Sequence, residues 1–199
     1  MDNAKAIKHL KKDKILGTLL DKYTVSTPKI STNLFQDLLE AIVCQQLSGK
    51  AASTIFGRFL GLFPKGHSPS PEDIFDQDED SLRSCGLSHQ KASYLKSLAE
   101  EIKSSRLVLE ELHVLPDEAV ITVLTKVKGI GRWTAEMFLI FSLGRLDTFS
   151  VGDLGLRTAV SRLYGVDRNN QTKIEEISKT WSPYRSLASL YLWKSLDNQ

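Results

Sequence analysis

The sequence is poor in side chains that bind metals or form disulfides. Its 199 residues include only two cysteines, Cys44 and Cys85, and four histidines. Two cysteines are too few for a disulfide framework or for a four-cysteine zinc or iron–sulfur site. His67, His89 and Cys85 are scattered, without the spacing of metal ligands. The composition therefore excludes a disulfide-stabilised scaffold, and it fits a reducing, intracellular compartment.

Long apolar runs are missing too. No stretch reaches the roughly 18 apolar residues that a membrane-spanning helix needs. The chain also does not open with the apolar core of a secretory signal. The sequence therefore predicts neither a membrane protein nor a secreted one.

A strong net charge is absent. The formal charge is +2 at pH 7, so net charge alone predicts no polyanionic partner. Acidic residues gather between Glu72 and Asp80, and basic residues gather between Lys8 and Lys14. A short basic run on a helix is usually a solvated face, and a nucleic-acid contact is the less favoured alternative.

Strict apolar–polar alternation is absent as well, which argues against β-strands. A first helix is expected at about residues 3–20. Further helices are expected to begin near Asn33, Ser48-Gly49, Ser70-Pro71, Ser88, Pro116, Arg132, Asp153, Asn170 and Ser182-Pro183. The pattern predicts an all-α protein of roughly ten helices in two lobes. One lobe would cover about 30–125 plus a following hairpin, and the other would combine the chain ends, 1–29 and 145–199.

That hairpin lies in the stretch VKGIGRWTAEMFLIF, which begins at Val127. Glycine tolerates positive φ and has no Cβ, so Gly129 and Gly131 can form a tight turn that a neighbour can approach closely. Ile130 between them is expected to point into the core. The next helix begins at Arg132, and its first amides and positive dipole end favour an anion. A plain αα-hairpin remains the alternative, although the lysine before the turn and the arginine after it favour the anion site.

Four segments in this order resemble the helix-hairpin-helix DNA glycosylase superfamily, and within it the 3-methyladenine (alkylpurine) DNA glycosylases of fungi and plants. They are AIVCQQLSGKAASTIFGRF, LRSCGLSHQKASYLKSLAEEI, VKGIGRWTAEMFLIFSLGRLDTFSVGDLGLR and WSPYRSLASLYLW. The resemblance implies that residues 1–199 form one two-lobed glycosylase unit. It also implies a protein that excises bases and binds double-stranded DNA with alkylated bases or abasic sites. Such a protein is expected in the nucleus if the source is a eukaryote. The sequence gives no signal of oligomerisation, so a monomer is expected.

The same resemblance implies two DNA-contacting elements. An enzyme that acts on a base must take it out of the stack, so a side chain has to fill the gap. The family places this plug after the second helix, at Gln46 or Leu47. The hairpin would grip a backbone phosphate with Lys128, Gly129, Ile130 and Gly131. No cofactor is required, but a structural Na⁺ or K⁺ could be held by the main-chain carbonyls of Thr125, Val127 and Ile130.

The catalytic position of the family falls on Asp153. Taken alone, Asp153 could simply be the N-cap of the helix that follows it. The two roles are compatible, because a helix N-terminus favours negative charge and a fixed carboxylate stabilises an oxocarbenium-like transition state. It can also deprotonate the attacking water. Asp147 is the competing carboxylate, and it is interpreted as a structural residue of the loop.

Aromatic residues bear on both the reaction type and the base pocket. Strand-cutting relatives carry a lysine nucleophile where this chain has Trp133, and tryptophan cannot form a Schiff base, so a monofunctional enzyme is expected. Alkylated purines are cationic and attract aromatic faces. The expected pocket residues are Trp133, Phe149 and Trp193, whereas Phe138 and Phe141 are expected to pack in the core.

Departures from the family pattern support an alternative function. Close relatives usually have a proline at position 150, where this chain has Ser150, and Gly152 replaces a polar residue before the aspartate. Proline fixes φ, so the Ser-Val-Gly loop is expected to aim Asp153 less rigidly. The alternative is a lesion or abasic-site binding protein with weak or no base excision.

Overall fold

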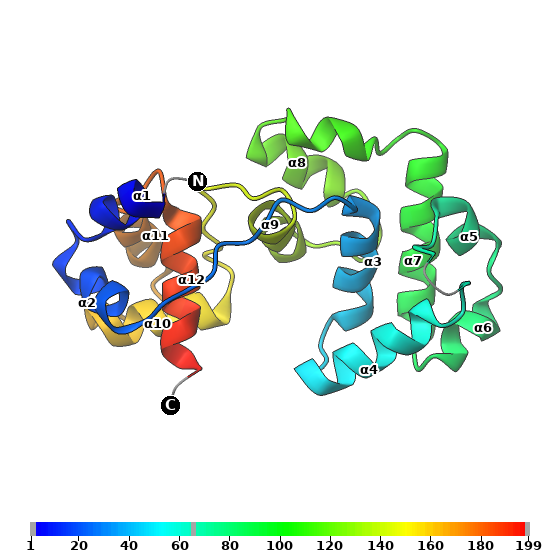
Figure 1. The fold of residues 1–199 in the computed structure, drawn as a ribbon, viewed down its shortest axis with the longest axis horizontal. Coiled ribbons are helices and arrows are strands. Elements are labelled where there is room, and N and C mark those ends of the chain that lie inside the picture. Colours follow the sequence, from blue (N-terminus) through cyan, green and yellow to red (C-terminus); the bar gives the residue numbers. More distant parts are fainter. Residues whose placement is uncertain (1–2, 65–66, 198–199) are drawn as a thin grey trace. The chain divides into compact units, whose positions relative to one another are not determined.

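The computed structural model describes residues 3–64 and 67–197, so the ends of the predicted 1–199 unit lie outside the described residues. Within these ranges the regular structure consists of twelve α-helices and one 3₁₀ helix, without a strand (Figure 1). This confirms the all-α prediction. The chain divides into two compact units: unit 1 contains the residues up to Ile30 and from Leu139 onward, and unit 2 runs from Ser31 to Phe138.

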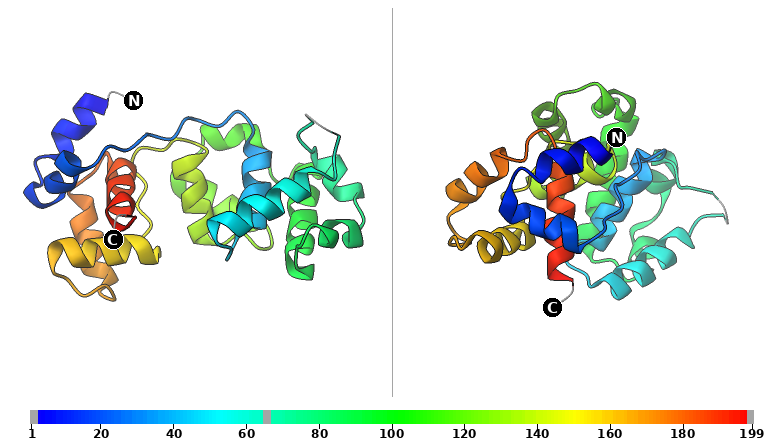
Figure 2. Two further views of the ribbon diagram at one scale, coloured as in Figure 1. Left: turned by 60° about the horizontal axis from the view of Figure 1, so that its bottom comes forward. Right: turned by 60° about the vertical axis from the view of Figure 1, so that its left-hand side comes forward.

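Unit 2 is built around a long helix, α7 (His89–Lys103), which packs against α3, α5 and α6 (Figures 1 and 2). Every third or fourth residue of α7 is fully buried, including Ala92, Leu95 and Leu98. The other elements of this unit are α3 (Leu34–Cys44), α4 (Gly49–Leu60), α5 (Pro71–Asp76), α6 (Glu79–Ser84), the 3₁₀ helix η1 (Leu109–His113), α8 (Asp117–Leu124) and the first part of α9 (Arg132–Phe141).

Three helices of unit 2 begin at side-chain caps near positions where the sequence predicts a helix start. Ser70 and Asp73 form a reciprocal capping box at α5, and the Ser88 hydroxyl accepts a bond from the Lys91 amide at α7. Asn33 caps α3 by accepting from the amide of Gln36. The helix starts predicted near Asn33, Ser70 and Ser88 are therefore confirmed.

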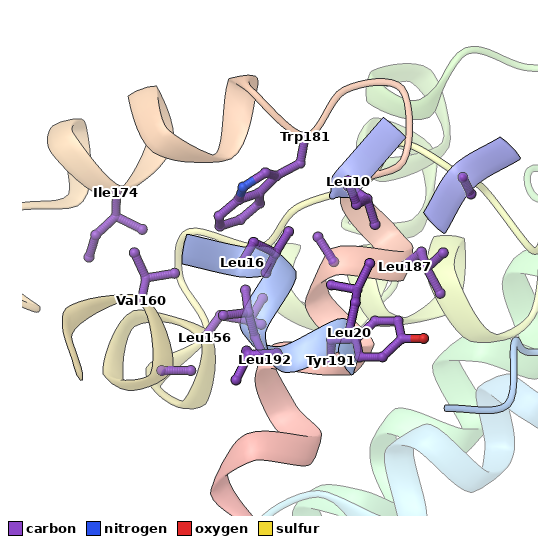
Figure 3. Packing of buried hydrophobic residues seen from close by; sticks show 14 residues of the cluster. Leu10, Leu16, Leu20, Leu156, Val160, Ile174, Trp181, Leu187, Tyr191 and Leu192 are labelled. Atoms are coloured by element: carbon purple, nitrogen blue, oxygen red, sulfur yellow. The ribbon is translucent and has the colours of Figure 1, made fainter. Parts of the chain in front are cut away.

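Unit 1 contains α1 (Asn3–Leu10), α2 (Lys14–Lys22), α10 (Leu154–Tyr164), α11 (Gln171–Lys179) and α12 (Arg185–Leu196). Apolar side chains from all five helices meet in one core, shown in Figure 3. Trp181, between α11 and α12, is fully buried there, with Leu16 of α2 and Leu156 of α10. The core joins the two ends of the sequence and holds α10 beside α12 (Figures 1 and 2).

The single helix expected at 3–20 is wrong, because the structure breaks it before Asp13. One carboxylate oxygen of Asp13 caps α2 by accepting from the amides of Ile15 and Leu16. The other accepts from the Tyr164 hydroxyl at 2.6 Å and the Trp181 indole at 3.0 Å. Burial would raise the pKa of Asp13, but these bonds outweigh it and hold the pKa below its ordinary value.

Candidate functional site

The hairpin between α8 and α9 is anchored by its apolar residues. Val127 and Ile130 are almost fully buried, which confirms that Ile130 points into the core. The Ile130 amide donates to the Val127 carbonyl at 3.1 Å, which closes the turn. The Gly131 carbonyl then accepts from the Ala135 amide as the first helical bond of α9. The buried residues thus fix the backbone that presents the helix start.

The two hairpin glycines are required for different reasons. Gly129 has a φ of +92°, and a Cβ there would lie 2.2 Å from ring carbons of Tyr94. Gly131 has no positive φ, and a Cβ there would meet no described atom within 4 Å. The fold therefore explains Gly129 but not Gly131. The space beside Gly131 suits a ligand that approaches the first amides of α9.

The two basic residues that flank the hairpin also differ. Lys128 is exposed and has no ion pair within the described ranges. Arg132 donates from Nε to Glu136 at 2.9 Å and from Nη1 to Glu118 at 3.1 Å. Two carboxylates engage the Arg132 guanidinium, so the structure leaves Lys128 as the stronger of the two candidates for an anion contact.

The plug turn, residues Gln45–Ser48 between α3 and α4, carries an unusual backbone angle. Gln46 has a φ of +57°, a conformation that non-glycine residues rarely adopt, and its side chain is exposed. Leu47 is half-buried, and its amide donates to the Cys44 carbonyl at 3.3 Å. Gln45 donates from Nε2 to the Gly129 carbonyl at 2.9 Å. The turn is thus joined to the hairpin by a side-chain bond.

A pocket of about 520 Å³ lies where the plug turn meets the hairpin. Its lining is mostly apolar, which is typical of small-ligand and base sites. The residues around it are Ala41, Cys44, Gln45, Gln46, Leu47, Gly129, Gly131, Trp133, Thr134 and Met137. Trp133 is 47% exposed at this pocket. The structure therefore brings together both plug candidates, both hairpin glycines and one of the three pocket aromatics.

Asp153 lies in unit 1, at the start of α10. Its Oδ1 accepts from the Leu156 amide at 2.7 Å, which confirms the N-cap. The same oxygen accepts from Nε1 of Trp193 at 3.0 Å. A Cβ on Gly155 would lie 3.1 Å from this oxygen and 3.3 Å from the indole. Glycine at 155 therefore leaves the room in which the carboxylate and the indole meet.

The other aromatic candidates differ in their burial and in the residues they contact. Trp193 also stacks on Phe141 at a centroid distance of 5.8 Å. Phe141 is 44% exposed, so the expectation that it packs in the core is wrong, whereas Phe138 is buried as expected. Phe141 ends α9 where the helix reaches the surface. Phe149 packs edge-on against the buried Trp181 at 5.7 Å, a position that serves the core of unit 1.

Asp147 has the structural role expected of it. Arg185 donates to its two oxygens at 2.8 and 3.1 Å, and the Ser182 hydroxyl donates at 2.8 Å. Burial would raise the pKa of Asp147, but these hydrogen bonds hold it below its ordinary value. The bidentate pair fixes the loop on the first turn of α12. The Asp147 carboxylate therefore stabilises the fold.

The loop before Asp153 is closed rather than loose. Ser150 is fully buried, and its carbonyl accepts from the Asp153 amide at 3.1 Å in a tight turn. Two residues earlier, the Thr148 amide donates to the Ser186 hydroxyl at 3.0 Å. The loop that was expected to aim Asp153 less rigidly, because it lacks a proline, is thus held by hydrogen bonds at both of these points.

Several site residues escaped the reading of the sequence. Gln45 acts through Gly129, and both Gly155 and Phe141 lie against Trp193, so no local pattern could reveal their roles. Lys91 belongs to a motif that the sequence identified without assigning it a task. Its Nζ donates to the Val43 and Gln45 carbonyls, both at 2.7 Å.

Residues 3–64 and 67–197 hold no group of three or more His, Cys, Asp or Glu side chains that could bind a metal ion. None of their helices has both the length and the apolar character needed to cross a bilayer.

Comparison with known proteins places these features in a wider group. A sequence model described as the HhH-GPD superfamily base excision DNA repair protein matches residues 39–183. DNA-3-methyladenine glycosylase 1 of Schizosaccharomyces pombe is 38% identical over 184 residues, covering 92% of this chain and 81% of the relative.

Two solved structures are similar over nearly the whole chain. A DNA-3-methyladenine glycosidase from Bacillus halodurans has a TM-score of 0.86 and 40% identity, covering 100% of this chain and 90% of that one. A 3-methyladenine DNA glycosylase of S. pombe in complex with abasic DNA has a TM-score of 0.84 and 37% identity, covering 97% of each chain.

Proposed function

The chain belongs to the HhH-GPD superfamily of base excision DNA repair proteins, and we propose that it is a monofunctional DNA glycosylase that hydrolytically removes alkylated purines such as 3-methyladenine. Residues 1–199 would act as one helix-hairpin-helix glycosylase unit. The observation that carries this proposal is the fixed carboxylate of Asp153. A helix amide at 2.7 Å and an indole N–H at 3.0 Å both donate to its Oδ1.

In the proposed reaction the bond between C1′ of the sugar and the purine nitrogen breaks, and the purine leaves with the bonding electrons. Positive charge then builds on the sugar, and the Asp153 carboxylate stabilises it. Asp153 also accepts a proton from the water that attacks C1′. An alkylated purine leaves readily because it carries a positive charge before the bond breaks and is neutral afterwards. Trp133, Phe149 and Trp193 are the proposed aromatic contacts of the cationic base.

Unit 2 would hold the DNA. The amides of Gly129 and Gly131 would bind a backbone phosphate with Lys128 beside them, while the buried Ile130 holds the turn. Gln46 or Leu47 would fill the gap left by the flipped base, whose removal from the stack costs roughly a few kcal/mol. Support comes from their shared position around one pocket, with Gly129 and Gly131. The partner is double-stranded DNA with alkylated bases or abasic sites.

The hairpin is also the proposed binding site of a monovalent cation, Na⁺ or K⁺, held by the carbonyls of Thr125, Val127 and Ile130. Thr125 is the C-cap of α8, and the last carbonyls of a helix carry partial negative charge, which suits a cation. The ion would brace the turn and take no part in the chemistry, so no cofactor is required. We also propose that the protein acts as a monomer inside the cell, and in the nucleus if the source is a eukaryote.

Product analysis tests the reaction type. Duplex DNA with 7-methylguanine or 3-methyladenine is incubated with the protein, free base is measured by mass spectrometry, and the strand is examined before and after alkali. We expect free base and a strand that breaks only in alkali, because Trp133 cannot form a Schiff base. Strand cleavage without alkali would contradict a monofunctional enzyme. Tight binding to abasic DNA without base release would instead support the lesion-binding alternative.

A further inference from the structure

Helix α7 supports both DNA-contacting turns of unit 2 and so provides a role for the motif LRSCGLSHQKASYLKSLAEEI. We propose that Lys91 and Tyr94 of α7, together with Gln45, form a clamp that holds the plug turn in register with the hairpin, with Lys91 as a positioning residue for Gln46 and Leu47. This inference rests on the proposed function, because it concerns how the plug is presented to DNA.

Lys91 supports the plug turn by binding its backbone. Its Nζ donates to the carbonyls of Val43 and Gln45, both at 2.7 Å. These carbonyls lie at the C-terminal end of α3, where backbone acceptors have no partner within the helix. Lys91 is half-buried, and burial lowers its pKa. The ammonium therefore replaces the capping that a glycine or an ordered water would otherwise give, and it fixes the direction in which the chain leaves α3.

Tyr94 supports the hairpin from the same helix. Its ring lies directly against Gly129, so close that a Cβ there would come within 2.2 Å. Lys91 and Tyr94 are three residues apart on α7, a spacing that places two side chains on one helix face. One face of α7 therefore contacts both turns, at Gln45 through Lys91 and at Gly129 through Tyr94.

Gln45 closes the connection directly. Its main-chain carbonyl accepts from Lys91, while its side-chain Nε2 donates to the Gly129 carbonyl at 2.9 Å. The next residue, Gln46, has a φ of +57°. A non-glycine residue in this conformation is strained and persists only when its surroundings impose it. The bonds on either side of Gln45 are the constraint that imposes it here.

The same helix offers a matched control. Lys96 is also half-buried on α7, burial also lowers its pKa, and its Nζ also donates to two main-chain carbonyls, those of Phe75 and Gln77. Phe75 lies in the last turn of α5 and Gln77 directly follows that helix, so neither residue belongs to the plug turn or the hairpin. Lys91→Met and Lys96→Met therefore make the same chemical change at a clamp site and at a site of general support.

Hydrogen exchange of the full chain without DNA tests the clamp itself. In Lys91→Met we expect exchange to accelerate about tenfold in segment 44–48, because two carbonyls lose their donor. Lys96→Met should accelerate exchange around 75–79 and leave 44–48 and 128–131 unchanged. Gln45→Met, which keeps the length of the side chain but not its donor, should accelerate 128–131. Unchanged exchange of 44–48 in Lys91→Met, with Gln45→Met equally silent, would overturn the clamp.

DNA binding tests its consequence. The probe is a duplex with a tetrahydrofuran abasic site beside 2-aminopurine, whose fluorescence reports plug insertion, with an undamaged duplex for comparison. In Lys91→Met we expect the preference for the abasic duplex over the undamaged duplex to fall about tenfold, while the affinity for the undamaged duplex stays that of the unsubstituted protein. Lys96→Met should retain both the preference and the affinity. Equal losses in the two variants would overturn the positioning role. If the unsubstituted protein itself shows no preference for abasic DNA, the proposed function fails, and the exchange result still decides the clamp.

Discussion

At the scale of residues, the two hairpin glycines have different roles, one in folding and the other in the proposed binding of DNA. Gly129 is required by the fold itself, because its φ is +92° and the Tyr94 ring occupies the place of a Cβ. Gly131 faces open space and precedes α9, where aspartate and asparagine are favoured N-caps. Nothing in the described fold therefore calls for glycine at 131. An approaching phosphate would supply the reason.

Gly131→Asp is accordingly expected to keep or slightly raise thermal stability while it weakens DNA binding. The new carboxylate can cap α9, but it lies where the phosphate would meet the first amides. The loss of charge-assisted bonds and the added repulsion should lower affinity for abasic DNA about tenfold or more. Fluorescence anisotropy at fixed salt measures the affinity, and a thermal melt measures stability.

Two further variants complete that comparison. Gly131→Asn has the same shape and the same capping ability without the charge, so it should bind better than Gly131→Asp. Gly129→Ala should lower the melting temperature, because it combines positive φ with a clash against Tyr94. Unchanged DNA affinity in Gly131→Asp would show that the hairpin is only a turn between helices.

At the scale of elements, the loop that leads into α10 is fastened at several points. Asp147 pairs with Arg185, Thr148 bonds Ser186, and the turn from Ser150 closes on Asp153. Each bond ties the loop to α12 or to the start of α10. This fastening replaces the stiffness that a proline at position 150 would provide, and it fixes the backbone that carries Asp153.

The Asp147–Arg185 pair should make stability depend on pH. The folded-state pKa of Asp147 lies below its ordinary value of 3.8. The pair's contribution to the unfolding free energy is therefore complete above about pH 3.8 and is lost as pH falls through the lower, folded-state pKa. The difference in unfolding free energy between the unsubstituted protein and Asp147→Asn should be larger at pH 6 than at pH 3, as measured by urea denaturation.

Asp21→Asn provides the comparison for that experiment. Asp21 pairs with Lys11 on the surface, where its side chain is 68% exposed and solvent screens the interaction. Its effect should be small at both pH values. An Asp147→Asn difference that stays constant from pH 6 to pH 3 would contradict the assigned role of the pair.

The helices show which elements could be predicted from sequence. Caps at Ser70, Ser88, Asp153 and Asn170 could be predicted because a cap needs only its own helix. The break at Asp13 cannot be predicted in this way, because the apolar periodicity continues across it. What stabilises the break is distant in sequence, namely the bonds from Tyr164 and Trp181 to the Asp13 carboxylate.

The candidate site also has a part that the sequence predicts and a part that only the structure reveals. Asp153, the hairpin and the plug turn could be located because their motifs are local and occur in the family's order. The Trp193 bond to Asp153 and the Gln45 bond to Gly129 join residues far apart in the chain, so only the structure reveals them. The pairing of Arg132 with Glu136 was foreseeable, since acidic and basic residues four apart on a helix commonly pair.

At the scale of the whole molecule, the proposed work is shared between the two units. Unit 2 holds the pocket formed by the hairpin and the plug turn, with Trp133 beside it. Unit 1 holds Asp153 with its indole partner, on a core that joins the two ends of the sequence. The proposed excision needs both, because unit 2 offers the grip on DNA and unit 1 offers the carboxylate.

The most direct measurement is the single-turnover rate of 7-methylguanine release from duplex DNA, with protein in excess, for the unsubstituted protein and Asp153→Asn. Asparagine is an equally good N-cap, so the variant should fold normally and still bind abasic DNA. Loss of the charge and of the base should slow release about 100-fold or more. An Asp153→Asn variant that releases the base at the unsubstituted protein's rate would contradict the account.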